Sequence, residues 1–301
     1  MNLETTHFLT GEELDKKTML RLLELSSQLK KRPHSHHRHL FKKHIALLFE
    51  KESLRTRMSF TVAVHHLGGE VIESISQTRK KEPPKDLIRV LQGYCDGVML
   101  RTSKDSILEE MAEYAHIPII NGLSDTYHPC QTMADLMTLK ECYPKNSFDT
   151  LRIAYIGDGN NILHSLLLMA TQLGIHVHYA CPPGQGPSQE VLKKLEKNNT
   201  HSLGVSFSTP EEAVKDCHAV YTDVWTSMGF EKKDESIFKG FQVNESLMKL
   251  ARKEAIFMHC MPMERGKEVS EGLPDSACSV IFQQSENRLH VQKALLIHFV
   301  N

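Results

Sequence analysis

Short apolar runs alternate with amphipathic segments along the first half of the chain. Each run has the length of a buried strand, and each amphipathic segment has the period of a helix. Strands are expected near residues 45–50, 70–75, 97–100 and 117–120. Helices are expected over Thr10 to Lys30, where Thr10 and Glu13 resemble a capping box, near 53–66, 85–94 and 105–115, and after Pro129. This alternation predicts a parallel sheet covered by helices on both faces.

The alternation resumes after a polar segment, residues 143–147, where we place a domain boundary. Strands are expected near residues 151–156, 175–180, 204–207, 219–223, 255–259 and 279–282. Helices are expected over residues 161–173 and 285–299. The sequence therefore predicts an α/β protein with two doubly wound parallel-sheet domains, residues 1–146 and 147–284. Residues 285–301 are expected to form a C-terminal helix that packs back across the domains, and the active site is expected in the cleft between them.

Composition narrows the class of protein. The chain has 301 residues, of which 40% are hydrophobic, and this is enough for two cores. The formal net charge of -1 gives no overall field that would attract nucleic acid or an anionic membrane. The seven cysteines are dispersed and never form a C-x-x-C pair, which indicates reduced thiols. No segment is long and apolar enough to span a membrane, so we expect a cytoplasmic protein.

A possible phosphate site follows the first expected strand. Ser53 is a suitable helix N-cap, and Arg55, Thr56 and Arg57 occupy the first turn behind it. A helix N-terminus flanked by guanidinium and hydroxyl donors favours phosphate binding. The alternative interpretation is a capped surface helix with solvated arginines, and this segment alone does not decide between them.

Other polar residues follow strands of the first half, where ligands bind in α/β proteins. Arg101 follows the third expected strand, and His128 and Gln131 stand where a strand gives way to a helix. His128 could donate a hydrogen bond to an oxygen that gains charge, and Gln131 could bind an amide-like group. A purely structural histidine is the alternative. Arg288 is expected at the start of the terminal helix.

The second half offers residues suited to an amine. Asp223 follows a strand and could bind an ammonium group, or it could simply cap a helix. Cys260 follows another strand and could act as a nucleophile, a polar contact or an inert thiol. Asn161 offers both a donor and an acceptor. This division between the halves indicates group transfer from a phosphorylated donor to an amine.

Two other kinds of site are disfavoured. Residues 157–161 partly imitate a dinucleotide-binding fingerprint, but Ile162 replaces its third glycine and the next strand ends without an acidic residue. A nicotinamide-dependent enzyme is therefore an unfavoured alternative. The histidine-rich residues 34–39 have no acidic or cysteine partner nearby, so we expect a basic loop rather than a metal site.

Taken in order, the motifs resemble the aspartate/ornithine carbamoyltransferase family, and among its members the ornithine enzymes. The resemblance runs nearly end to end. It rests on Phe49-Glu50-Lys51 with Ser53-x-Arg55-Thr56-Arg57, His128-Pro129-Cys130-Gln131, Gly157-Asp158-Gly159-Asn160-Asn161, Asp223-x-x-x-Ser227-Met228-Gly229, His259-Cys260-x-Pro262, and Glu286-Asn287-Arg288-x-His290-x-Gln292-Lys293-Ala294.

The resemblance implies a carbamoyl phosphate domain, an ornithine domain, a homotrimer, and a reaction that gives citrulline and phosphate. The chemistry of this transfer requires no metal and no organic cofactor, and no cluster of ligand residues in the sequence suggests one. The residues that it places at carbamoyl phosphate are Ser53, Leu54, Arg55, Thr56, Arg57, Arg101, His128, Gln131, Cys260, Met261 and Arg288. Those that it places at ornithine are Asn161, Asp223, Ser227 and Met228. The catalytic set that it implies is Arg55, Arg101, His128, Asp223, Cys260 and Arg288.

Two segments depart from the family pattern. Leu54 stands where the ornithine enzymes usually carry threonine, and residues 77–86 replace the usual loop. These departures leave two alternatives open. One is a sister carbamoyltransferase that acts on an acylated ornithine or putrescine, and the other is a non-catalytic relative with an impaired phosphate site.

Overall fold

The computed structural model describes residues 7–51, 53–75, 82–226 and 234–300, and the chain forms two compact units. Unit 1 consists of Met1–Met137 together with Glu286–Asn301, and unit 2 consists of Thr138–Ser285. Unit 1 therefore ends within helix α5 (Pro129–Cys142), before the polar segment 143–147. Its second segment lies within helix α10 (Ile281–Phe299) and the residues that follow.

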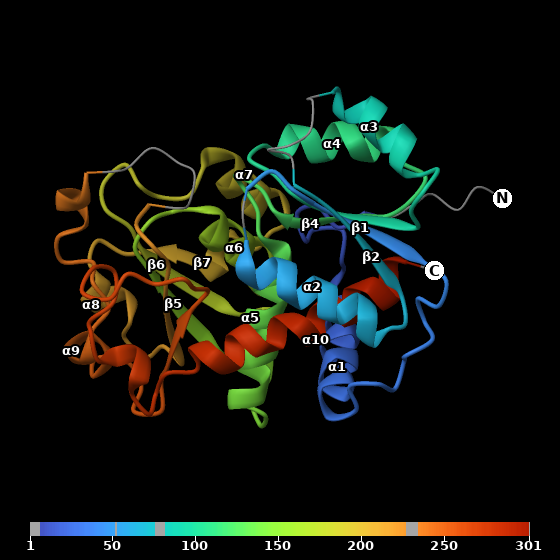
Figure 1. The fold of residues 1–301 in the computed structure, drawn as a ribbon. Helices are drawn as coiled ribbons and strands as arrows, with labels where there is room; N and C mark the ends of the chain where they lie inside the picture. The colour runs from blue at the N-terminus through green and yellow to red at the C-terminus, as the bar shows by residue number, and fades with distance from the viewer. Residues whose placement is uncertain (1–6, 52, 76–81, 227–233, 301) are drawn as a thin grey trace. The chain divides into compact units, whose positions relative to one another are not determined.

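Unit 1 is built on a four-stranded parallel sheet with the order β2-β1-β3-β4 (Figure 1). Its strands are β1 (His44–Phe49), β2 (Glu70–Ile75), β3 (Gly97–Arg101) and β4 (Ile119–Leu123). Its other helices are α1 (Lys16–Lys31), α2 (Leu54–His66), α3 (Pro84–Leu91) and α4 (Asp105–Tyr114). Phe49 of β1 lies opposite Arg101 of β3, so these two strands end at the same level.

One face of this sheet is buried against α3 and α4. The central strands present Ala46, Leu48, Val98 and Leu100 on this face, as the two-residue period of a strand requires. They pack in one apolar cluster with side chains of the two helices, including Ile88, Leu108 and Met111. The core thereby fixes the strands whose carboxyl ends carry the polar residues described below.

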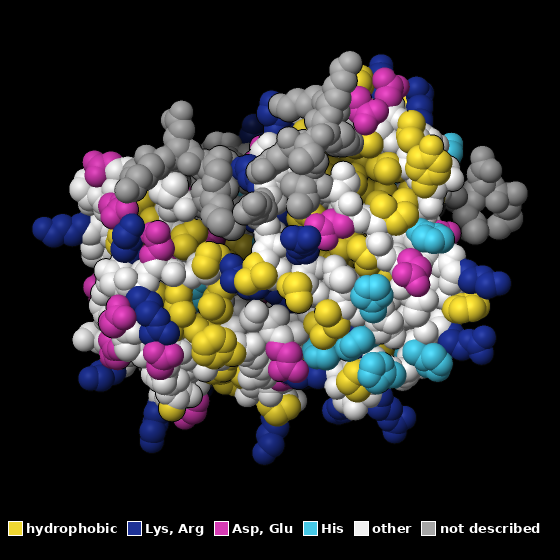
Figure 2. Space-filling model, in the orientation of Figure 1, with side chains coloured by type: hydrophobic (Ala, Val, Ile, Leu, Met, Phe, Trp, Pro, Cys, Tyr) yellow, Lys and Arg dark blue, Asp and Glu magenta, His cyan; other side chains and the backbone are white. Residues whose placement is uncertain are grey.

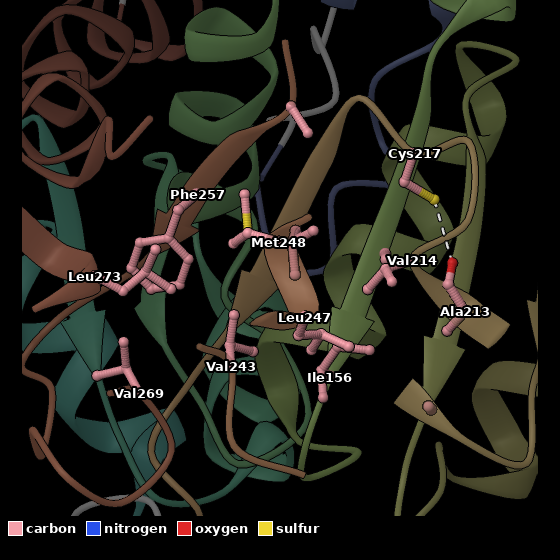
Figure 3. Close-up of a cluster of buried hydrophobic side chains, with 14 of the residues drawn as sticks. Ile156, Ala213, Val214, Cys217, Val243, Leu247, Met248, Phe257, Val269 and Leu273 are labelled. Carbon is pink, nitrogen blue, oxygen red and sulfur yellow. Dashed lines mark hydrogen bonds between the residues drawn. The ribbon is translucent and has the colours of Figure 1, made fainter. Parts of the chain in front are cut away.

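Unit 2 contains a five-stranded parallel sheet with the order β7-β6-β5-β8-β9. Its strands are β5 (Arg152–Ile156), β6 (His176–Ala180), β7 (Gly204–Ser206), β8 (Ala219–Thr222) and β9 (Ile256–His259). Its other helices are α6 (Asn161–Gln172), α7 (Gln189–Lys197), α8 (Pro210–Ala213) and α9 (Glu245–Met248), with short 3-10 turns at Phe148–Thr150, His201–Leu203, Glu235–Phe238 and Leu273–Asp275. Figure 3 shows part of its core, in which Phe257 of β9 packs with Met248, Val269 and Leu273.

The prediction of two parallel α/β sheets is confirmed, and two local predictions are wrong. Residues 279–282 do not form a strand: Ser279 makes a single bridge to Phe257, and α10 begins at Ile281 rather than Ser285. A short apolar run fits a buried helix start as well as a strand, which explains the error. The first helix begins at Lys16 rather than near Thr10, because Asp15 caps it by accepting from the Thr18 N–H at 2.7 Å.

Histidine side chains gather on one face of unit 1, near α1 and the C-terminal end of α2 (Figure 2). His34 belongs to the histidine-rich turns, and its ring lies 4.8 Å from that of His66 on α2. In the part of the chain that the structure describes, no helix combines the length and the apolar character that crossing a membrane requires.

Candidate functional site

Helix α2 opens as its sequence predicts, directly after β1. Ser53 has an extended backbone, with φ of -157°, and its Oγ accepts from the Thr56 N–H at 3.3 Å. Leu54 is 72% exposed, so its side chain does not fill the turn. Arg55 is half-buried beside it. The amide groups of this first turn provide the partial positive charge that favours an anion.

Two buried arginines converge on Thr56. The Nη2 of Arg288 donates to the Thr56 Oγ1 at 2.6 Å, and the Nη1 of Arg101 lies 3.5 Å from the same oxygen. Their exposed fractions are only 3% for Arg288 and 7% for Arg101. Two guanidinium groups directed at one oxygen concentrate positive charge at this point of unit 1. Such a concentration favours an oxyanion, and phosphate matches the geometry of guanidinium donors.

Arg288 does not stand at a helix start, contrary to the prediction. Helix α10 begins at Ile281, so Arg288 lies about two turns inside it. The residue still reaches Thr56, because its long side chain projects from the helix. The N-terminal dipole of α10 therefore makes no close contribution at Arg288, and the guanidinium alone supplies the positive charge.

His128 provides a neutral hydrogen-bond donor near Arg101 and Arg288. It is 4% exposed, and burial lowers its pKa well below the usual value, with Arg288 and Arg101 lowering it further. A neutral imidazole can donate one N–H to a carbonyl oxygen that gains negative charge. We call Thr56, Arg101, His128 and Arg288 the anion site; all four lie in unit 1.

Gln131 and Arg57 have specific partners in unit 1. Gln131 is buried, and its Nε2 donates to the Asp135 Oδ1 at 2.8 Å. The Arg57 guanidinium binds Glu73 of β2, with Nε and Nη2 at 2.9 and 2.8 Å from the two carboxylate oxygens. The Arg57 side chain is therefore directed to β2, whereas its amide remains part of the first turn of α2.

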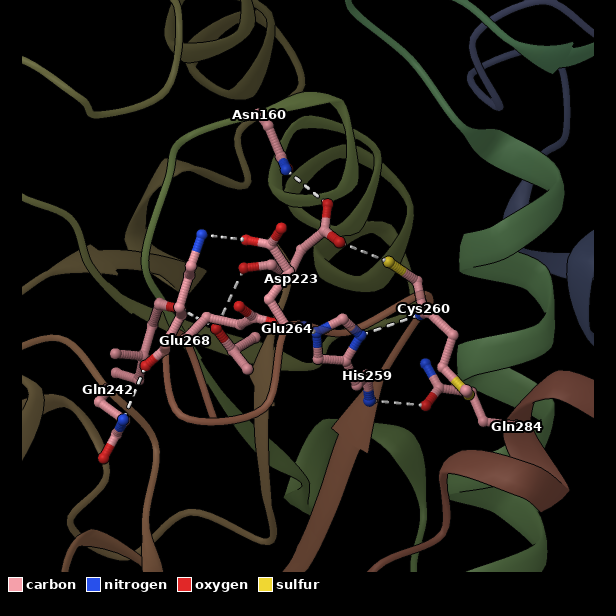
Figure 4. A network of polar contacts seen from close by, with 12 residues as sticks. Asn160, Asp223, Gln242, His259, Cys260, Glu264, Glu268 and Gln284 are labelled. Carbon is pink, nitrogen blue, oxygen red and sulfur yellow. Dashed lines mark hydrogen bonds and ion pairs between the residues drawn. The ribbon is translucent and has the colours of Figure 1, made fainter. Parts of the chain in front are cut away.

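The polar group of unit 2 forms where β8 and β9 end. Thr222 pairs with His259 in the sheet, so the residues that follow them, Asp223 and Cys260, lie side by side. The Cys260 Sγ donates to the Asp223 Oδ1 at 2.9 Å, and the Asn160 Nδ2 donates to Asp223 Oδ2 at 2.7 Å (Figure 4). We call Asn160, Asp223 and Cys260 the carboxylate site.

Asn160 is a member of this site that the sequence analysis missed. Its Oδ1 caps α6 by accepting from the Ile162 N–H at 3.0 Å, and it also accepts from the Tyr155 hydroxyl at 3.0 Å. Asn161, which was predicted as a ligand, is the buried first residue of α6. An asparagine directly before a helical pattern is a preferred N-cap, and this signal could have identified Asn160.

Met261 is held by its neighbour His259. The Met261 N–H donates to the His259 Nδ1 at 2.9 Å, and its φ of +58° lies in the left-handed region. The His259 Nε2 lies 3.1 Å from Glu268 Oε1, and both side chains are fully buried. The Met261 amide is thus already bonded, whereas the Cys260 thiol bonds the carboxylate of Asp223. The predicted ligands Ser227 and Met228 lie outside the described residues.

A metal does not fit this group without disruption. Ligand atoms of Asp223, His259 and Cys260 lie within 4.8 Å of one another. However, both ring nitrogens of His259 are engaged, one by Met261 and the other by Glu268. A metal ion would have to displace one of these buried contacts.

The two sites differ in their chemistry. Within unit 1 the structure brings together cationic and neutral donors suited to a phosphate bonded to a carbonyl group. Within unit 2 it brings together a carboxylate with a thiol and an amide, which suits a substrate amine. Cys130 and Cys217 are not part of either site, and burial raises the pKa of each thiol to about 12.

Family models match both parts of the chain. The carbamoyl-P binding domain of aspartate/ornithine carbamoyltransferase matches residues 6–141. The Asp/Orn binding domain of the same family matches residues 149–299.

Individual relatives agree with these matches. The chain is 43% identical to an ornithine carbamoyltransferase of Anoxybacillus flavithermus, over 99% of this chain and 97% of that protein. It is 46% identical to an anabolic ornithine carbamoyltransferase of Pyrococcus furiosus, over 86% of this chain and 84% of that protein. Among solved structures, an anabolic ornithine carbamoyltransferase of Campylobacter jejuni superposes with a TM-score of 0.91 at 39% identity, covering 98% of each chain.

Proposed function

The chain belongs to the aspartate/ornithine carbamoyltransferase family, and we propose from this premise that it transfers the carbamoyl group of carbamoyl phosphate to L-ornithine. The products are L-citrulline and phosphate. The observation that carries this proposal is the anion site, where Arg101 and Arg288 converge on Thr56 beside a neutral His128. The names of its relatives select ornithine as the amine.

Carbamoyl phosphate is proposed to bind to unit 1. The α2 turn, Ser53 to Arg57, would bind the phosphate through its amides and through Arg55, with Leu54 contributing only its backbone. Arg101 and Arg288 would stabilise the phosphate as it departs, and His128 would donate to the carbonyl oxygen. Fixed donors of this kind contribute roughly 3–4 kcal/mol each to the transition state.

Ornithine is proposed to bind to unit 2. Asn161, Ser227 and Met228 would bind its amino acid part, and Asp223 with Cys260 would orient the side-chain amine. The amine must be neutral to attack, so its ammonium form first loses one proton to solvent. Its nitrogen then bonds to the carbonyl carbon, and the bond from that carbon to the phosphate oxygen breaks. The nitrogen loses its second proton to the departing phosphate. The Cys260 and Met261 backbone would line the carbonyl group. Fixing both reactants in position can remove about 7–11 kcal/mol from the barrier.

We further propose that the protein forms a homotrimer and acts in the cytoplasm. The large apolar side chains of Leu54, Met58 and Ile72 are 72%, 56% and 44% exposed, on α2 and β2 of unit 1. Contact with another copy of the chain would remove this apolar surface from water. A reducing compartment agrees with the free state of the cysteines. The proposed chemistry uses no cofactor.

A panel of amines tests the substrate. Ornithine, putrescine and an N-acylated ornithine are each incubated with carbamoyl phosphate, and the carbamoylated product is measured. We expect ornithine to be carbamoylated most efficiently. Preference for the acylated amine or for putrescine would favour a sister transferase. If calorimetry detects no binding of carbamoyl phosphate, the non-catalytic alternative replaces the proposal.

A further inference from the structure

Gln131 presents the two ends of its amide to different surroundings. Its Nε2 donates to the Asp135 Oδ1 at 2.8 Å, one turn further along α5. Its Oε1 is buried and has no hydrogen-bond partner among the described residues. The exposed fractions of Gln131 and Asp135 are 1% and 0%, so water cannot supply the missing bond without entering the interior. A buried acceptor without a partner is costly unless a ligand satisfies it.

Asp135 determines which end of the amide is available. A carboxylate only accepts hydrogen bonds, so the amide group that faces it must be the NH2 end. The carbonyl end of Gln131 is then turned away from Asp135. His128 lies just before α5, and its carbonyl accepts from the Gln131 N–H at 3.0 Å, so the two residues are neighbours at the start of this helix.

The family resemblance places Gln131 at carbamoyl phosphate, and we propose that Asp135 is a positioning residue that fixes the orientation of the Gln131 amide. Asp135 thereby makes Gln131 an acceptor that prefers a carbamoyl group to an acetyl group. This inference rests on the proposed function. The carbamoyl group has an NH2 that can donate to the Gln131 Oε1. Acetyl phosphate has the same shape but carries a methyl group there, and it would leave the oxygen unsatisfied. A buried polar group left without its partner is the strongest basis for rejecting an isosteric ligand.

The test compares the KM for carbamoyl phosphate with the inhibition constant of acetyl phosphate, using the full-length protein. Asp135→Asn keeps the size of the side chain but can donate as well as accept, so the Gln131 amide is free to turn over. We expect the KM for carbamoyl phosphate to rise about tenfold or more. The inhibition constant of acetyl phosphate should change much less, so the ratio between the two constants shrinks.

Thr132→Val provides the matched control. Thr132 neighbours Gln131 on α5, it is fully buried, and its Oγ1 has no partner among the described residues. The substitution removes a buried polar atom of the same helix without touching the Gln131 contact. We expect the ratio of the two constants to stay at its wild-type value in this variant.

The outcomes separate this inference from the proposed function. If both constants rise by the same factor in Asp135→Asn, or if neither changes, Asp135 has only a structural role and the inference is overturned. If the wild-type protein neither binds nor uses carbamoyl phosphate, the proposed function itself fails.

A second pair of variants covers the case in which Asp135→Asn does not fold. Gln131→Glu alone places two carboxyl groups in contact, and we expect it to weaken carbamoyl phosphate binding. Adding Asp135→Asn to Gln131→Glu restores a donor facing an acceptor and leaves one oxygen for the carbamoyl NH2. Partial recovery of the preference for carbamoyl over acetyl phosphate supports the inference, and no recovery overturns it.

Discussion

Removal of the Glu268 carboxyl group should destabilise unit 2 and misplace the residues around Cys260. The His259 Nδ1 accepts from the Met261 amide, so Nε2 carries the ring proton and donates to Glu268 Oε1 at 3.1 Å. The same oxygen accepts from the Glu264 N–H at 2.6 Å. Glu268→Ala deletes the acceptor of both donors and leaves the His259 ring without the contact that orients it.

The magnitude follows from these contacts. Leaving the fully buried His259 donor without an acceptor should lower the free energy of unfolding by about 1–3 kcal/mol. Loss of the contact with the partly buried Glu264 amide should lower it by about 1 kcal/mol. The cavity left by the deleted side chain lowers it further. We therefore expect Glu268→Ala to lower the free energy of unfolding by about 2–5 kcal/mol. Glu268→Gln keeps one acceptor oxygen and should cost roughly 1–2 kcal/mol.

Urea unfolding measures this effect through Trp225, the single tryptophan of the chain, which stacks on Phe238 in unit 2 with ring centroids 5.1 Å apart. The matched control is Glu264→Ala, because among the described residues the Glu264 carboxylate pairs with Lys267 at the surface, and the substitution keeps the backbone N–H contact with Glu268. Its effect should be within ~0.5 kcal/mol. Turnover should fall in Glu268→Ala and recover in Glu268→Gln. If Glu268→Ala has the same urea midpoint and turnover as the wild type, then Glu268 neither stabilises unit 2 nor positions the residues around Cys260.

Three further predictions concern unit 1. Thr56→Val removes the oxygen shared by the two arginines and should raise the KM for carbamoyl phosphate about tenfold; an equal rise in the KM for ornithine would contradict this reading. Arg55→Ala should lower turnover by roughly two orders of magnitude or more at an unchanged urea midpoint, and undiminished turnover would remove Arg55 from the phosphate site. Burial lowers the pKa of His128 below 6.5, so the unfolded chain binds a proton that the folded protein excludes. The contribution of His128 to the free energy of unfolding is therefore complete above pH 6.5 and is lost as the pH falls below it. His128→Asn should make the urea midpoint less sensitive to acid. An unchanged pH dependence in this variant would contradict the prediction.

Much of the fold was predictable because its signals are local. Strands of three to six residues bounded by turns, and amphipathic segments between them, identify most elements to within a few residues. The errors occur where two structures share one pattern. The run from Ser279 to Phe282 fits a strand or a helix start, and only the packing of Ile281 in the unit 2 core decides. Asp15, not Thr10, caps α1, because a capping pattern predicts a helix start only approximately.

The residues of the candidate site, except Asn160, could be selected from the sequence, but their contacts could not. Strand ends indicated Arg101, Asp223 and Cys260, because ligands of parallel sheets bind there. No local pattern indicates that Arg288 reaches Thr56, since the two residues are far apart in the chain. Nor does one indicate that Arg57 binds Glu73. Such pairings depend on the packed arrangement of several elements, which the sequence does not specify locally.

Unit 1 is discontinuous in the chain, and this has a consequence during synthesis. Its first segment ends at Met137, but its second segment, Glu286–Asn301, is synthesised only after the whole of unit 2. Unit 2 is continuous and can begin to fold once it has left the exit tunnel. The first segment of unit 1 must wait for its second segment, Arg288 included, until all of unit 2 has been synthesised. A chaperone that binds this chain during translation should therefore bind the first segment of unit 1 for longer than it binds unit 2.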